Sequence, residues 1–94
     1  MTNTKLQLLL KNEGYPSYMI GDTITKLEML QPIVAKQFDS WVDSGMFPDL
    51  SIEGISFAKL VKERGMNPIG AFLALDWLAR EPETAKTSLS KKLK

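Results

Sequence analysis

Residues 67–79, Asn67-Pro-Ile-Gly-Ala-Phe-Leu-Ala-Leu-Asp-Trp-Leu-Ala79, form the most apolar stretch of the chain and decide its fold. Asn is a favoured N-cap residue, and proline at the first helical position loses no hydrogen bond, because an N–H there has no intrahelical partner. Asp76 is the only charged residue of the stretch, so the helix has no broad polar face. Such a helix is normally enclosed by its neighbours. We therefore expect a central helix over 68–80.

Prolines and glycines divide the rest of the chain into short helices. A leucine cluster spaced i, i+3, i+4 predicts a helix over 4–12 that ends at Gly14. A longer apolar stripe then advances in steps of three or four residues through Ile20, Ile24, Leu27, Leu30, Val34, Phe38 and Trp41. Pro32 interrupts this stripe, and an interior proline costs a helix about 3 kcal/mol. We expect two helices here, 17–30 and 32–44, that present one shared face to the central helix.

The segment that follows Gly45 and a loop is harder to assign. Leu50 and Ile52 alternate as in a strand, whereas Ile55 and the residues beyond it suit a helix. We expect a helix over 56–64, capped by Ser56 and ended by Gly65, and leave open whether 50–57 is strand or helix. A last helix is expected over 83–91, with a frayed basic tail at 90–94. The prediction is an all-α, compact bundle of four to six short helices around helix 68–80, in a single domain 1–94.

Composition narrows the classes of function. The 94 residues are 44% apolar and 24% charged, as in an ordinary globular domain. Cysteine and histidine are both absent. Their absence removes thiolate nucleophiles, sulfur ligands for zinc and the usual general base near neutral pH, and the acidic residues nowhere follow the pattern of a calcium loop. We predict that the protein is not an enzyme and binds no metal or cofactor.

Hydropathy and charge argue against two further classes of partner. No segment approaches the roughly 20 apolar residues that span a membrane, and the leucine run at 6–10 is too short for a secretory signal. A cytoplasmic protein without a membrane partner is therefore expected. The net charge is +1. Residues 1–50 hold four lysines and six acids, and residues 51–94 hold eight basic residues and five acids, an asymmetry too mild for a dedicated nucleic-acid binder.

Helices 56–64 and 68–80, joined by a turn at Gly65, nevertheless have the layout of a helix-turn-helix. The second helix of that motif usually offers polar side chains near its N-terminus to DNA, whereas this one offers Pro68, Ile69 and Phe72. A DNA-binding, helix-turn-helix-like regulator is retained as the alternative function. Its phosphate contacts would come from Lys59, Lys62, Arg64, Lys86, Lys91 and Lys92.

The tripeptide Met46-Phe47-Pro48 resembles one found in ubiquitin-binding modules of the CUE type, which are three-helix domains. The resemblance continues weakly at Asn67, Ala71 and Phe72, but the di-leucine of that family's last helix is replaced by Asp76-Trp77-Leu78. It implies a ubiquitin-binding fold. The residues themselves favour a simpler interpretation, in which Phe47 is a loop residue that packs against the core.

The function we expect first is that of a small non-enzymatic interaction or regulatory protein. It would present a helical surface to a protein partner or to a second copy of itself. Large apolar side chains in or beside loops are hard to bury, and they mark the expected contact surface. These residues are Tyr15, Tyr18, Met46 and Phe47.

Overall fold

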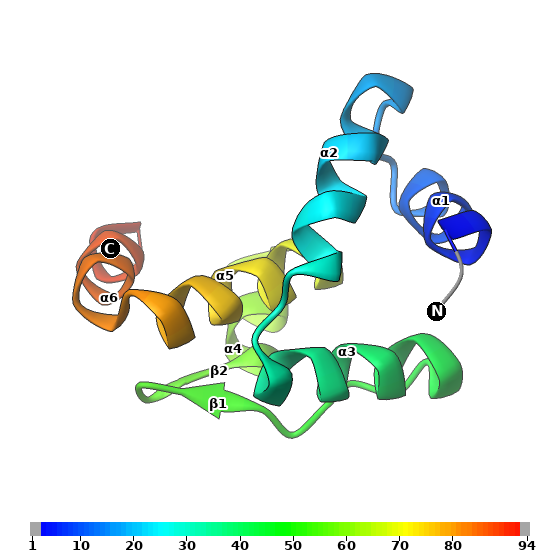
Figure 1. The fold of residues 1–94 in the computed structure, drawn as a ribbon. Helices are drawn as coiled ribbons and strands as arrows, with labels where there is room; N and C mark the ends of the chain where they lie inside the picture. Colours follow the sequence, from blue (N-terminus) through cyan, green and yellow to red (C-terminus); the bar gives the residue numbers. More distant parts are fainter. Residues whose placement is uncertain (1–2, 93–94) are drawn as a thin grey trace. The chain divides into compact units, whose positions relative to one another are not determined.

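The computed structural model describes residues 3–92, with side-chain exposure for residues 5–88. This part of the chain contains six α-helices and one two-stranded β-hairpin (Figure 1). The predicted all-α class is therefore confirmed. By its internal contacts the chain forms two compact units, Met1–Leu30 and Gln31–Lys94. The boundary between them falls at the break that Pro32 predicts.

The first unit contains the helices α1 (Asn3–Asn12) and α2 (Ser17–Glu28), which pack against each other. Gly14 ends α1 as predicted, with φ +89°. The N–H of Tyr15 reaches back to the carbonyl of Leu10 at 3.0 Å and closes the last turn. This is the bond that a glycine in the left-handed conformation makes possible. The connection is short, so α1 and α2 form a helical hairpin.

Helix α3 (Pro32–Ser44) opens the second unit and has the predicted bounds. Pro32 occupies its first turn, where proline is tolerated, and Gly45 ends it with φ +74°. Its buried residues, Val34, Phe38 and Trp41, are those of the predicted stripe. Helix α3 packs against the central helix, as expected. The sequence also predicts that α2 faces the central helix. Because α2 belongs to the other unit, this stays a prediction.

Residues 50–57, left open by the sequence, form a hairpin that leads into a helix. Strand β1 (Ser51–Ile52) pairs antiparallel with β2 (Ile55–Ser56). The turn residues Glu53 and Gly54 have φ of +53° and +79°. Positive φ at both central residues is the mark of a type I′ turn, whose twist suits a hairpin. The N–H of Phe57 also donates to the carbonyl of Leu50 at 2.8 Å, which extends the pairing by one step.

Glu53 is the strained residue of this turn, because the left-handed conformation costs an ordinary L-residue roughly 1–2 kcal/mol. Asparagine tolerates that conformation, and Asn-Gly is the preferred type I′ pair. We expect Glu53→Asn to raise the free energy of unfolding by roughly 0.5–1 kcal/mol, measured as a higher urea midpoint at an unchanged m-value. Gly54→Ala should act in the opposite direction. Equal midpoints for Glu53→Asn and the parent chain would contradict this account of the turn.

Two short helices follow the hairpin, and both have the predicted caps. Helix α4 (Phe57–Lys62) begins after Ser56, whose hydroxyl accepts the N–H of Lys59 at 3.1 Å. It ends two residues earlier than predicted, in a turn where Gly65 has φ +69°. Helix α5 (Pro68–Arg80) has the predicted bounds, and the side-chain oxygen of Asn67 accepts the N–H of Gly70 at 2.8 Å. Local capping chemistry therefore sets where both helices begin.

Helix α5 is the centre of the second unit, as predicted. It packs against α3, α4, β1 and the last helix, α6 (Pro82–Lys92) (Figure 1). Phe72 is fully buried, and its ring lies 4.6 Å from Phe57, 5.2 Å from Phe38 and 5.5 Å from Trp41, measured between centroids. These distances are typical of favourable aromatic pairs. The aromatic side chains of α3, α4 and α5 thus meet at one point in the core.

Asp76 adds a polar link between two helices of this core. It is only 8% exposed. One carboxylate oxygen accepts the Nε–H of Arg80 at 2.7 Å, and the other accepts the backbone N–H of Gln31, also at 2.7 Å. Gln31 is the N-cap residue of α3 and makes no side-chain cap of its own. A carboxylate at a helix N-terminus is favourable, so α5 supplies the anion that stabilises the start of α3.

Candidate protein-interaction surfaces

The loop that follows α3 carries an apolar pair, Met46 and Phe47, which we call the Met46–Phe47 pair. Met46 is 73% exposed and Phe47 is 46% exposed. The ring of Phe47 nevertheless contacts the fully buried ring of Phe57, edge to face, at 5.3 Å between centroids. Phe47 thus packs on the core, as the simpler interpretation of the sequence predicts. It still leaves about half of its surface in water.

The start of this loop is held by hydrogen bonds. The hydroxyl of Ser44 donates to the carbonyl of Ser40 at 2.8 Å and accepts the N–H of Met46 at 3.1 Å. The ring contact of Phe47 fixes the next residue. The apolar pair is therefore presented from an ordered position, which lowers the conformational entropy that a contact would have to overcome.

The two predicted tyrosines belong to the first unit. Tyr15 is half-buried, and its backbone closes the end of α1. Tyr18, in the first turn of α2, is 81% exposed. Of the predicted contact residues, Tyr18, Met46 and Phe47 are accessible, whereas Tyr15 has a structural role. The tyrosines and the Met46–Phe47 pair belong to different units, so each is a surface of its own unit.

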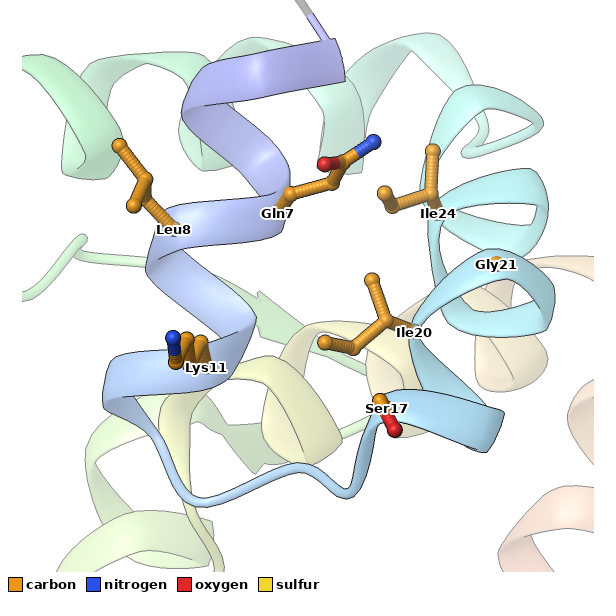
Figure 2. A pocket seen from close by; sticks show the side chains of 7 residues that line it. All are labelled: Gln7, Leu8, Lys11, Ser17, Ile20, Gly21 and Ile24. Carbon is orange, nitrogen blue, oxygen red and sulfur yellow. The ribbon is translucent and has the colours of Figure 1, made fainter.

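A groove lies between α1 and α2 in the first unit, with a volume of about 530 Å³ (Figure 2). Its lining residues are Gln7, Leu8 and Lys11 from α1 and Ser17, Ile20, Gly21 and Ile24 from α2. The side chain of Ile20 points toward α1 in Figure 2. A Cβ atom placed on Gly21 would meet nothing within 4 Å, so this part of the groove is open.

The sequence did not single out this groove or several of the other exposed apolar residues. Leu8 and Ile33 are each 58% exposed, and Met29 is 60% exposed. Leu8 lies off the i, i+3, i+4 set of α1, and Ile33 lies off the stripe of α3. A position off the apolar stripe was the available indication of exposure.

The lysines of the alternative function lie on two helices that each pack against α5, and Arg64 lies in the turn after the first of them. Lys59 and Lys62 are exposed on α4, and Lys86 is exposed on α6. Arg64 is half-buried and has an interaction partner. Helix α6 runs to Lys92, but the side chains of Lys91 and Lys92 lie outside the described part, as does the end of the predicted tail.

The outward line of α5 is apolar where a DNA-reading helix would present polar groups. The half-exposed residues of α5 are Pro68, Gly70, Leu73 and Trp77, and the side chain of Asn67 is used in the cap. No protein-family model, curated protein or solved structure matches the chain.

Metal-binding clusters and membrane-spanning helices are both absent from the described residues. No three acidic side chains between residues 3 and 92 lie close enough together to hold a metal ion. None of the helices in that range has the length and apolar character required to cross a bilayer.

Proposed function

We propose that the protein is a small non-enzymatic interaction or regulatory protein, which presents a helical surface to a protein partner or to a second copy of itself. Exposed apolar residues scattered singly over a surface carry no such meaning. Here two of them are adjacent in one ordered loop, and another, Leu8, borders a groove between two helices.

The Met46–Phe47 pair is the observation that carries this proposal. Phe47 is anchored on Phe57 yet about half exposed, and Met46 beside it is mostly exposed. Aromatic and methionine side chains are enriched in interface cores. The flexible thioether of methionine adapts to different partner surfaces. An anchored ring next to an adaptable side chain suits the recognition of an apolar patch on another protein.

Photo-crosslinking in cells tests the proposal. A photoreactive residue at position 46 should capture discrete protein adducts, which Phe47→Ala should weaken. The same residue at Asp49, exposed in the same loop, is the matched control. Because Phe47→Ala loses one aromatic pair, it should also cost roughly 0.5–1.5 kcal/mol of stability.

A second measurement covers the first unit. Tyr18→Ala, at a residue that is 81% exposed, should alter self-association or pull-down profiles and leave stability nearly unchanged. Two results together would contradict the proposal. Positions 46 and 49 would give identical adducts, and the Tyr18→Ala and Phe47→Ala variants would differ from the parent only in stability.

The alternative function is supported by the observed helix-turn-helix layout of α4, the turn at Gly65 and α5, with Lys59 and Lys62 exposed on the first helix. Phosphate contacts by these lysines would be sequence-independent, and affinity would fall steeply with salt. A mobility shift on duplex DNA at low salt that disappears at physiological salt would favour this alternative.

A further inference from the structure

The α1–α2 groove is lined by apolar side chains in its middle, and charged residues lie toward its two ends. Leu8, Ile20 and Ile24 supply the apolar part, and Gly21 leaves room above α2 for another helix to approach closely. Leu8 is 58% exposed although it lines a groove. In four-helix bundles, the apolar face of one helix pair is covered by a second pair.

A lysine lies at one end of the groove, and a glutamate lies beyond its other end. Lys11 lines the end beside Ser17, close to the loop that joins the helices (Figure 2). Ser17, Gly21, Ile24 and Glu28 follow each other at intervals of four, three and four residues, so Glu28 continues the groove face of α2 to the opposite end. Glu28 lies about 16 Å from Ser17 along the helix, from a rise of about 1.5 Å per residue. Lys11 and Glu28 are both exposed.

We infer that this groove is the interface through which two copies of the chain form a two-fold symmetric dimer, α1–α2 hairpin against α1–α2 hairpin. A two-fold axis through the middle of the groove places the Lys11 end of one copy on the Glu28 end of the other. Lys11 of each copy then pairs with Glu28 of the other, and the apolar middle of the groove faces the same surface of the second copy. The same patch serves on both partners, as an isologous interface requires. This inference rests on the proposed function, since it names the partner of one of the exposed apolar surfaces.

The occupant is a second copy because the charge pattern of the groove is complementary to itself. Helix α1 carries Lys5 and Lys11 and no acidic residue, while α2 carries Asp22 and Glu28 against Lys26. A basic helix therefore meets an acidic one across the two-fold axis. The face is only about 18 Å long, from the rise of a helix of this length. We expect an interface at the small end of the specific range and a dissociation constant on the order of micromolar.

Charge reversal tests the pairing. Lys11→Glu and Glu28→Lys, each studied alone by sedimentation equilibrium of the full chain, should weaken dimerisation about 10- to 30-fold, because symmetry presents each changed charge twice. An equimolar mixture of the two variants should restore association to within about three-fold of the parent, since both pairs are then opposite in sign. A mixture as weak as its components would overturn the inference.

Two substitutions test the apolar middle. Leu8→Glu should weaken dimerisation by about 10- to 100-fold, whereas Ile33→Glu, equally exposed on α3, should leave it unchanged. Gly21→Ala should raise the thermal midpoint of the monomer, because alanine favours a helix and its Cβ meets nothing here. In the dimer the same methyl lies where the second copy packs, so association should weaken. A purely structural role for Gly21 would not give effects of opposite sign.

The outcomes separate this inference from the proposed function. A chain that remains monomeric at every concentration up to the millimolar range overturns the dimer. So does a dimer that is insensitive to Leu8→Glu. If specific adducts at position 46 persist in either case, the interaction function stands with a different partner and surface. If those adducts are also absent, both the inference and the function fail.

Discussion

Phe72→Ala is expected to lower the free energy of unfolding by about 3–5 kcal/mol, the largest loss from a single substitution that we predict for this chain. The ring is fully buried and contacts three other aromatic rings, those of Phe38, Trp41 and Phe57. Its removal leaves a cavity where three helices meet, and the surrounding backbone can close it only in part. In a domain of this size each kcal/mol corresponds to roughly 4–8 °C in the thermal midpoint.

Chemical denaturation followed by circular dichroism measures this loss. Phe72→Leu, which refills much of the volume, should lose far less stability than the alanine variant. Leu73→Ala is a positional control, because Leu73 is the next residue of α5 but only half-buried. If Phe72→Ala and Leu73→Ala lose equal amounts of stability, α5 is not the centre of the core.

Asp76→Ala is expected to cost about 2–4 kcal/mol, because one substitution removes an ion pair and a helix cap together. The N–H of Gln31 loses its acceptor at the start of α3, and the guanidinium of Arg80 loses its contact with this carboxylate. An unsatisfied donor in a partly buried position carries the full cost of its desolvation.

Two variants separate the two contacts of Asp76. Asp76→Asn keeps an oxygen that can accept the N–H of Gln31 and should recover part of the loss. Arg80→Gln removes the ion pair with Asp76, in which the guanidinium side chain is 36% exposed, but leaves the acceptor of the Gln31 N–H in place, and should cost less than Asp76→Ala. Hydrogen exchange should report faster opening at the first turn of α3 in Asp76→Ala. Unchanged exchange there would contradict the capping role.

The helices of this protein could be predicted from the sequence because their ends are specified locally. Pro32 and Pro68 sit in first turns, Asn67 and Ser56 cap, and Gly45 takes the left-handed conformation. Each of these features acts within a few residues of the place it marks. The boundaries of α3 and α5 were therefore correct to the residue.

The hairpin and the cap of α3 were not predictable in the same way. Each strand is only two residues long, so the alternation of Leu50 and Ile52 covers too few residues to distinguish a strand from a helix. Glu53 also occupies a position where Asn or Gly would indicate a type I′ turn. The i, i+4 pair of Asp76 with Arg80 could be seen in the sequence. The bond from Asp76 to Gln31 could not, because it joins residues 45 positions apart.

The exposed surfaces were predicted in part. Large apolar residues near loops indicated Tyr18, Met46 and Phe47, and these are accessible. Tyr15 is half-buried in the same kind of position. The groove was missed because its shape depends on how α1 and α2 pack, and helical periodicity in one segment does not report which face of a neighbour is left uncovered.

The aromatic residues are divided between the two units in a way that makes each unit optically distinct. Both tyrosines belong to residues 1–30, and both tryptophans, Trp41 and Trp77, belong to residues 31–94. Tryptophan fluorescence excited where tyrosine does not absorb therefore reports the second unit alone, whereas the circular dichroism of the helices reports both units. Coincidence of transitions seen by different probes is the test of all-or-none unfolding. The unlabelled chain thus carries two separate spectroscopic reporters of whether its units melt together or in turn.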